Sequence, residues 1–239
     1  MPVAAAHLRP VQVSSSRSAG PAPIRVLVVD DHPAVRLGVQ RLLDARVDFD
    51  LIATVAGGPE AIAEVAARPV DVAVLDYQLG SGQDGLWLTQ TLKSLGAPPR
   101  VLVYSAYADA PLALAALVAG ADGLLSKGGL GDELCEAIRH VYRGDRVMPR
   151  VPQVLLESIG ERLDLTSRER ALLRLLVDET PEADIEALLG LSARQLREWR
   201  RAILHALTGP AGRARLPWDD GFAPLHYMRA ARLRGGYGR

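Results

Sequence analysis

Short apolar runs alternate with amphipathic stretches over residues 24–144. The apolar runs predict five strands, which cover residues 24–29, 51–55, 72–75, 101–104 and 123–125. The stretches between them have helical periodicity and predict helices at residues 34–45, 59–67, 85–95, 111–119 and 132–142. Strands that alternate with helices in this way are typical of a parallel sheet with helices on both faces. We therefore predict a five-stranded, doubly wound α/β fold.

Polar side chains follow four of the predicted strands at the point where each strand ends. Asp30 and Asp31 follow the first strand, Asp76 the third and Ser105 the fourth, and Lys127 lies just after the fifth. Taken singly, such residues are commonly helix caps, turn residues or solvated charges. Ligands of an open parallel sheet bind beyond the carboxyl ends of its strands, so we expect these five side chains to converge.

This set of side chains suits the transfer of a phosphoryl group to a carboxylate. Neighbouring carboxylates repel one another, and a hard divalent cation such as Mg²⁺ relieves that repulsion through oxygen ligands. Asp30 and Asp31 would hold the cation, while Asp76 would attack the phosphorus of a phosphohistidine donor. Lys127 would neutralise charge on the phosphoryl oxygens. Ser105 would then donate a hydrogen bond to the acyl phosphate and draw its loop inward.

The motifs VLVVDDHP, VAVLDYQLGSGQDG, VLVYSA and GADGLLSKG resemble those of the receiver domain of bacterial response regulators, a flavodoxin-like fold. The resemblance implies that a sensor histidine kinase phosphorylates Asp76, with Ser105 and Lys127 stabilising the phosphate. The implied Mg²⁺ ligands are Asp30, Asp31, Asp76 and the backbone carbonyl of Gln78.

Three features depart from the receiver pattern. Gly80 stands where a proline is usual, and the loop at residues 76–84 is one residue longer than usual. Leu124 occupies the position of an aromatic switch residue, for which Tyr104 and Tyr107 are candidate replacements.

A second, smaller all-α domain follows the α/β domain. The segment GDRVMPRVP ends the helical pattern of residues 132–142 and reads as a linker. Three helical signatures then occupy residues 166–207, and the first opens with Thr166 and Glu169 at capping-box spacing. The predicted organisation is a disordered leader at 1–23, a receiver domain at 24–144, a linker with a short helix at 145–163, a helix-turn-helix domain at 164–208, and a basic extension at 209–239.

The short break at residues 190–192 has the spacing of a helix-turn-helix, whose second helix enters the major groove of DNA. That second helix has an apolar stripe formed by Leu196, Trp199, Ile203 and Leu207. Another face carries Arg194, Arg197 and Arg201, and arginine suits contacts with phosphates and guanine. From charge alone, a solvated basic helix in a regulatory bundle is an equal alternative.

LTSRER and ALLGLSARQLREWRRAILHAL resemble the NarL/FixJ group, whose output is a LuxR-type helix-turn-helix. The resemblance implies binding to promoter DNA as a homodimer, with Arg197 and Arg201 toward the bases and Arg194 on phosphate. Glu186 replaces a small residue, and Trp199 with Arg200 replaces a polar-then-apolar pair. Either the last helix is rotated to bury Trp199, or this output domain has diverged.

Composition limits the cellular compartments and the binding partners that the protein can have. The formal net charge is zero, no apolar run approaches the roughly 20 residues of a membrane span, and a single cysteine excludes an intramolecular disulfide. We expect a cytoplasmic protein without a membrane contact. The extension at 209–239 is basic, and Arg229, Arg232 and Arg234 are candidate contacts with the DNA backbone.

The sequence therefore predicts a phosphorylation-controlled, DNA-binding transcriptional regulator that is not an enzyme acting on a separate substrate. The alternative is an atypical receiver that acts through a protein partner or ligand, with phosphorylation or DNA binding lost. A flavodoxin-like or phosphatase-like enzyme would share the sheet, but the cofactor loops or second catalytic acid that it needs are not found.

Overall fold

The computed structural model describes residues 22–80, 84–129 and 131–208. Nearly all of the predicted leader, together with Arg229, Arg232 and Arg234 in the predicted extension, lies outside the described residues. The five strands are β1 (Ile24–Val29), β2 (Phe49–Val55), β3 (Val72–Asp76), β4 (Arg100–Ser105) and β5 (Gly123–Ser126). They form one parallel sheet in the order β2-β1-β3-β4-β5, which confirms the predicted fold class.

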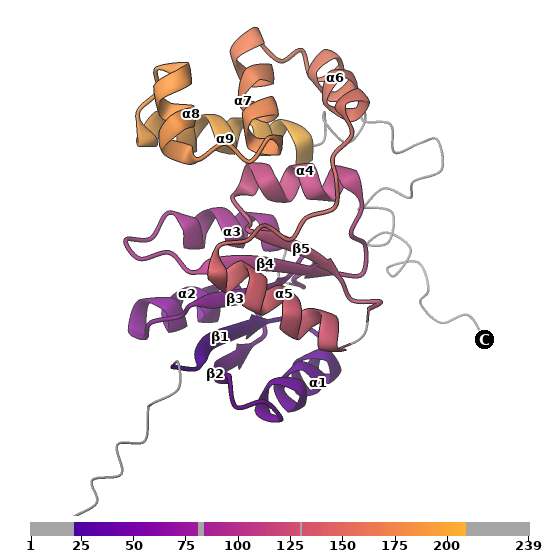
Figure 1. Ribbon diagram of the computed structural model, residues 1–239, viewed down its shortest axis with the longest axis vertical. Helices are drawn as coiled ribbons and strands as arrows, with labels where there is room; N and C mark the ends of the chain where they lie inside the picture. Colours follow the sequence, from indigo (N-terminus) through magenta and orange to yellow (C-terminus); the bar gives the residue numbers. More distant parts are fainter. Residues whose placement is uncertain (1–21, 81–83, 130, 209–239) are drawn as a thin grey trace, which may run out of the picture.

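Five helices cover the two faces of this sheet (Figure 1). They are α1 (Pro33–Asp44), α2 (Gly58–Ala67), α3 (Gly85–Lys93), α4 (Ala110–Ala119) and α5 (Gly131–Arg143). Side chains of α1 and α5 share one apolar cluster with the sheet, and side chains of α2, α3 and α4 share another on the opposite face. The strands are therefore buried on both faces, which explains their nearly continuous apolar sequences.

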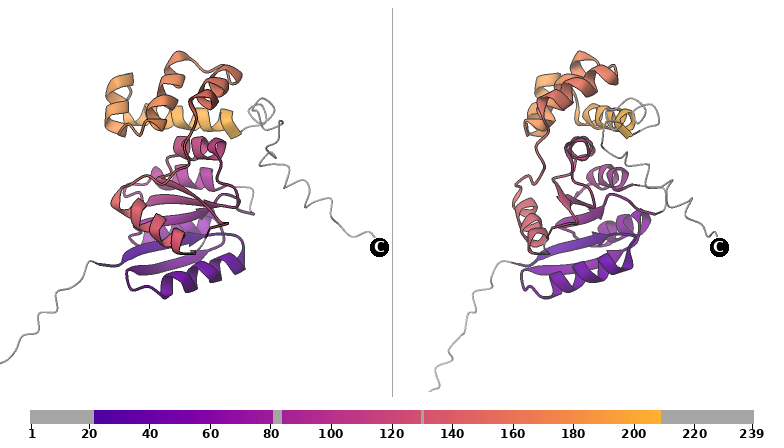
Figure 2. Two further views of the ribbon diagram at one scale, coloured as in Figure 1. Left: turned by 45° about the vertical axis from the view of Figure 1, so that its right-hand side comes forward. Right: turned by 90° about the vertical axis from the view of Figure 1, so that its right-hand side faces the viewer.

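Four further helices form a separate layer above α4 (Figures 1 and 2). They are α6 (Gln153–Arg162), α7 (Ser167–Val177), α8 (Glu182–Leu189) and α9 (Ala193–Thr208). Thr166 and Glu169 form the expected capping box at the start of α7. The turn between α8 and α9 begins at Gly190, whose φ of 62° ends α8 in the left-handed region that glycine favours.

Helix α4 lies between the sheet and the C-terminal helices. Every residue of α4 from Leu112 to Ala119 is buried, because the sheet and α3 cover one side while α7 and α9 pack on the other. A helix that is apolar all round needs neighbours on all sides, and PLALAALVAG is such a sequence. One apolar cluster therefore runs from the sheet through α4 into α7, α8 and α9.

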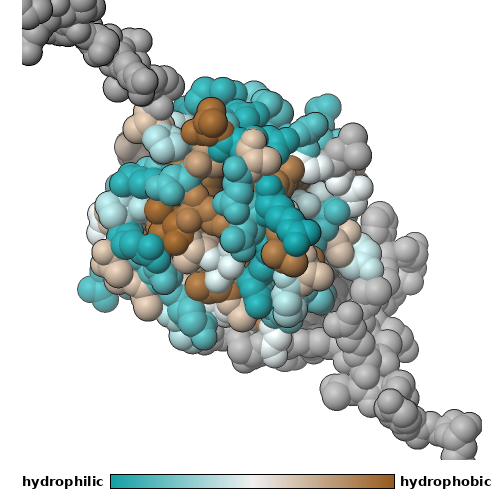
Figure 3. Space-filling model, turned by 90° about the horizontal axis from the view of Figure 1, so that it is seen from below, coloured by the Kyte–Doolittle hydropathy of each residue, from teal (hydrophilic) through white to brown (hydrophobic). Residues whose placement is uncertain are grey.

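The end of the molecule farthest from α6–α9 has a mixed surface. Figure 3 views this end, where hydrophobic groups are separated by hydrophilic ones. Leu37 on α1 and Val47 between α1 and β2 are among the exposed large apolar side chains. Among the described residues, the helices are all too short or too polar to cross a bilayer.

Candidate functional site

The carboxyl ends of β1 and β3 place two buried carboxylates side by side. Val29 pairs with Leu75 in the parallel ladder, so Asp30 and Asp76 occupy adjacent strand ends. Only 2% of Asp30 and 4% of Asp76 is exposed. The ammonium of Lys127, just beyond β5, lies 2.6 Å from Asp30 Oδ2 and 2.9 Å from Asp76 Oδ2. Three residues that are far apart in sequence thus form one charged cluster.

Burial and charge act against each other in this cluster. Burial raises the pKa of Asp76, the charge of Asp30 adds to that rise, and hydrogen bonding to Lys127 opposes it. Burial acts to lower the pKa of Lys127, but its hydrogen bonds to Asp30 and Asp76 outweigh burial, and the pKa is raised. The lysine therefore stays cationic, which is the charge that a bound anionic phosphoryl group needs.

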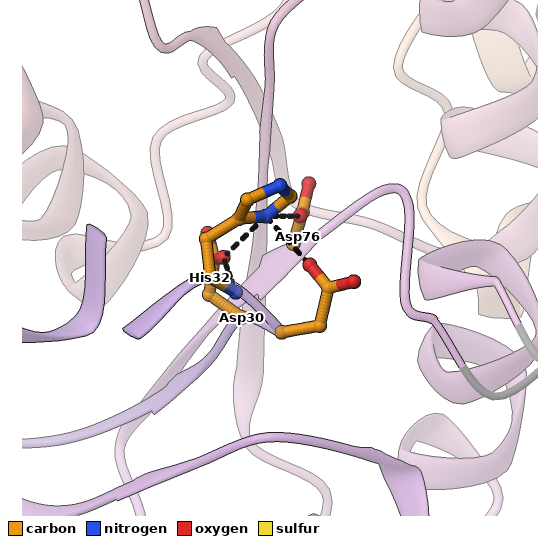
Figure 4. Close-up of side chains that lie close together, drawn as sticks. Asp30, His32 and Asp76 are labelled. Carbon is orange, nitrogen blue, oxygen red and sulfur yellow. Dashed lines mark hydrogen bonds and ion pairs between the residues drawn. The ribbon is translucent and has the colours of Figure 1, made fainter. Parts of the chain in front are cut away.

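His32 is a member of the cluster that the sequence reasoning did not assign. Its Nδ1 lies 2.6 Å from Asp31 Oδ1. The same atom lies 3.3 Å from Asp30 Oδ1 and 3.9 Å from Asp76 Oδ2 (Figure 4). Ligand atoms of these four residues all lie within 4.8 Å of one another. His32 directly follows the acidic pair in the DDHP motif, and that adjacency is the sequence signal for its place in the cluster.

The donor set fits a divalent cation. Asp31 Oδ1 and His32 Nδ1 are buried atoms that form an ion pair with each other at 2.6 Å but no well-directed hydrogen bond. Buried polar atoms are normally hydrogen-bonded, so Asp31 beside two further carboxylates is consistent with a place for a ligand. Three carboxylates supply the oxygen atoms that hard cations prefer.

Ser105 connects the cluster to α4. It ends β4 beside β3, since Asp76 pairs with Tyr104, and it is buried. Its hydroxyl accepts a hydrogen bond from Tyr107 N at 3.2 Å, and its carbonyl accepts one from Lys127 N at 2.7 Å. Residues 106–109 then lead directly into α4. A loop of four residues therefore joins Ser105 to the start of α4.

The departures from the receiver pattern have structural counterparts. Leu124 is buried, and the ring of Tyr104 lies 5.9 Å from Lys127 Nζ. A Cβ at Gly80 would come within 2.9 Å of Asp31 Oδ2, so a side chain there would push on that carboxylate. The backbone N–H of Gln78 donates to Asp76 Oδ1 at 3.2 Å.

Gly85 holds the loop after β3 close to the phosphoacceptor candidate. A Cβ at this position would lie 2.2 Å from the carbonyl oxygen of Asp76, which is backbone and cannot turn away. We expect Gly85→Ala to lower the free energy of unfolding by about 3 kcal/mol, as overpacking does in cores. Gly38→Ala is the control, because a Cβ there meets open space within a helix. It should stabilise by about 0.5–1 kcal/mol. Urea unfolding measures both, and equal effects would contradict the close approach.

Comparisons with known proteins agree with this geometry. A family model described as the response regulator receiver domain matches residues 26–139. The chain is 32% identical to the nitrate/nitrite response regulator protein homolog of Haemophilus influenzae, over 77% of this chain and 90% of that protein. The chain belongs to the response regulator family.

Two further relatives extend the likeness of this response regulator beyond residue 139. The DNA-binding transcriptional activator DevR/DosR of Mycobacterium tuberculosis is 32% identical over 77% of this chain and 88% of that protein. A LuxR-family two-component response regulator from Aurantimonas sp., whose crystal structure is known, is 31% identical to this chain, with a TM-score of 0.50. The match covers 59% of this chain and 99% of that chain.

The basic face of α9 in this response regulator is exposed. The side chains of Arg194, Arg197 and Arg201 all reach solvent, and Arg194 Nε lies 2.9 Å from Glu198 Oε1. Trp199 is partly buried against the apolar cluster, whose buried members in α9 are Leu196, Ile203, Leu204 and Leu207. Trp199 and Arg200 therefore both lie on the side of α9 that packs inside the molecule.

Arg200, to which the sequence pattern assigned no role, connects α9 to α4. Its side chain is only 11% exposed, and its guanidinium donates to the carbonyls of Val118 at 3.0 Å and Leu117 at 2.8 Å. Glu182 of α8 is its ion-pair partner. Burial lowers the pKa of Arg200, and Glu182 opposes that shift. The response regulator thus holds its α9 on the C-terminal end of α4, where backbone carbonyls attract cations.

Proposed function

We propose that this response regulator is a phosphorylation-controlled, DNA-binding transcriptional regulator, and that Asp76 accepts the phosphoryl group. The observation that carries the proposal is the pair of buried carboxylates at adjacent strand ends, both of which form an ion pair with the ammonium of Lys127. The relative DevR/DosR, named as a DNA-binding transcriptional activator, supports the output half of the proposal.

The phosphoryl donor is a phosphohistidine of a sensor histidine kinase. Asp76 Oδ attacks phosphorus, the P–N bond to the imidazole breaks, and an acyl phosphate forms on Asp76. Asp30, Asp31, Asp76 and the backbone carbonyl of Gln78 would hold Mg²⁺, which supplies charge neutralisation when bound. Lys127 already contacts Asp76, so its ammonium is in place to pair with a phosphoryl oxygen.

The readout passes from Ser105 to α4 and from α4 to α9. Ser105 donates its hydroxyl hydrogen to the acyl phosphate, which requires its loop to move toward Asp76. That loop leads directly into α4. Helix α4 in turn contacts α9 through the hydrogen bond of Arg200 and through the shared apolar cluster. Movement of α4 therefore disturbs the surface on which α9 lies.

Helix α9 is the DNA-reading helix, and its place beside α4 restrains it. The major groove is about 12 Å wide, and a helix with its side chains is about 10–12 Å across. Helix α4 packs along α9, and we infer that α9 enters the groove only after it leaves α4. Arg197 and Arg201 then approach the bases and Arg194 a phosphate.

The proposed division of labour follows the predicted boundaries. Residues 24–144 receive the phosphate, residues 164–208 bind promoter DNA, and residues 145–163 connect them. The protein acts in the cytoplasm as a homodimer. Helix α4 is buried on all sides, so it cannot form a dimer surface while α7 and α9 cover it.

Replacement of Asp76 tests the proposal. We expect wild-type protein to gain the mass of one phosphoryl group from acetyl phosphate in the presence of Mg²⁺, and Asp76→Asn to gain none. Asp44→Asn is the control, because Asp44 is an exposed carboxylate at the end of α1. Intact-mass spectrometry reads the modification.

Genome-wide DNA occupancy of the same variants tests the output. Discrete promoter peaks that disappear in Asp76→Asn would support the full scheme. Peaks that are indifferent to Asp76 would retain DNA binding and remove the phosphate switch. An absence of peaks in every variant would move the function to a protein partner.

A further inference from the structure

We propose that Glu198 is a specificity-determining residue of α9, whose carboxylate selects a cytosine in the major groove of DNA. The inference rests on the proposed function, in which α9 reads DNA, and it adds part of the sequence that α9 reads. Its basis is the place of one acidic side chain within a basic face. Glu198 is the acidic residue of α9, and Arg194 and Arg201 lie on either side of it along the helix.

Glu198 lies on the side of α9 that is opposite the core side chains. Leu196 and Leu207 are buried in the apolar cluster. Successive residues of a helix are about 100° apart, so Glu198 lies about 160° around the axis from Leu196 and about 180° from Leu207. Arg194 and Arg201 are each within about 60° of Glu198 on the same scale. Any approach that brings both arginines to DNA therefore brings this carboxylate to DNA between them.

The fold does not depend on this carboxylate. The Glu198 side chain is 53% exposed, and its ion-pair partner Arg194 is 83% exposed. Exposed pairs of this kind contribute little to stability. The pair joins Arg194 Nε to Glu198 Oε1 at 2.9 Å, and the terminal Nη groups of the arginine remain able to contact a phosphate. A substitution at Glu198 thus changes the exposed face of α9 and leaves its buried face intact.

The chemistry of a carboxylate determines which base it selects. An ionised carboxylate accepts hydrogen bonds and donates none. In the major groove guanine presents two acceptors, thymine an acceptor and a methyl group, and adenine an acceptor beside its donor. Cytosine presents a donor, its N4 amino group, without an adjacent acceptor. Because phosphates and guanine both repel a carboxylate, cytosine is the favourable partner for Glu198 on DNA.

The selected C·G pair is expected next to the base pair that Arg201 contacts. Three residues of helix rise about 4.5 Å, and neighbouring base pairs are about 3.4 Å apart. Glu198 and Arg201 therefore reach adjacent base pairs when α9 lies in the groove. Arginine pairs most often with guanine, so preferred sites should contain one cytosine and one guanine at adjacent positions.

Selection of duplexes from a random-sequence library tests the inference, with the full chain treated with acetyl phosphate and Mg²⁺. We expect the wild type to select a cytosine at one position. Glu198→Gln should change that base to adenine, because a side-chain amide both accepts and donates and pairs with adenine N6 and N7. Glu198→Ala should abolish the preference for cytosine. Both variants should bind the wild-type duplex about 10-fold more weakly, as the loss of a base contact does.

Glu157→Gln is the matched control, because Glu157 is an exposed glutamate on α6 that pairs with Gln153. It removes the same charge and should leave the selected base and the affinity unchanged. Fluorescence anisotropy on the selected duplex and on a scrambled one separates a base contact from simple repulsion. Loss of a base contact weakens binding to the selected duplex alone. Tighter binding of Glu198→Gln to both duplexes would show repulsion and overturn the inference.

The selection separates failure of this inference from failure of the proposed function. An unchanged base in Glu198→Gln, or wild-type sites without a preferred cytosine, would overturn the inference and leave α9 as the DNA-reading helix. A wild-type protein that selects no sequence would overturn the inference together with the DNA-reading role of α9.

Discussion

Arg200→Gln is expected to raise the DNA affinity of the unphosphorylated protein, whereas Arg201→Gln lowers it. The two residues are neighbours on α9 and carry the same charge, but Arg200 contacts α4 and Arg201 faces solvent. Removal of Arg200 weakens the closed arrangement, in which α9 packs on α4, relative to an open state in which α9 has left α4. Removal of Arg201 takes away a charge that is available to DNA. Opposite effects from adjacent arginines would separate these two roles.

The size of the Arg200 effect follows from its hydrogen bonds. A hydrogen bond that involves a charged group contributes about 1.5–3 kcal/mol, and Arg200 donates two to α4 besides its pairing with Glu182. Water hydrates the α4 carbonyls once α9 has left, so the substitution destabilises the closed arrangement and has little effect on the free energy of the open state. A shift of about 1.4–2.8 kcal/mol toward the open state raises apparent affinity by about 10-fold to 100-fold.

Fluorescence anisotropy with a duplex selected from a random-sequence library measures these affinities. Arg201→Gln should also reduce the preference for the selected duplex over a scrambled one, as the loss of a base contact does, whereas Arg200→Gln should leave that preference unchanged. A fall in affinity in both variants would show that Arg200 itself binds DNA and would contradict the closed arrangement as the restraint.

Lys127→Gln is expected to lower the free energy of unfolding by about 3 kcal/mol in the absence of divalent cations. The substitution leaves Asp30 and Asp76 buried next to each other without their shared counter-charge. The loss should shrink at acidic pH, because burial already raises the pKa of Asp76 and a protonated carboxyl needs no counter-charge.

Lys93→Gln is the matched control for Lys127. Lys93 pairs with Asp122 at 2.5 Å, but Asp122 also pairs with Arg100 at 2.9 Å and accepts from the backbone of Val101. Its removal leaves a carboxylate that still has partners, so we expect a loss of about 1 kcal/mol or less. Urea unfolding with and without Mg²⁺ measures both variants, and Mg²⁺ should restore part of the Lys127→Gln loss. Equal losses would contradict a special role for Lys127.

The cluster at the strand ends was predictable because its signal is local. Each strand is a short apolar run, and the residue that follows it is visible in the sequence. The parallel topology, itself indicated by the alternation of strands and helices, then requires Asp30, Asp76 and Lys127 to meet. The helix-turn-helix break was predictable for the same reason, since Gly190 and the capping residues act on their own neighbours.

The α/β fold, the order of its polar strand ends and the basic face of α9 could all be inferred from the amino-acid pattern. Three features follow only from the packing in three dimensions: α4 lies under α9, Arg200 binds carbonyls 82 and 83 residues earlier, and Nδ1 of His32 faces the carboxylates. Periodicity shows that a face is buried, but not which element buries it. Backbone carbonyls are present in every residue, so a contact with them leaves no mark in the sequence of the partner.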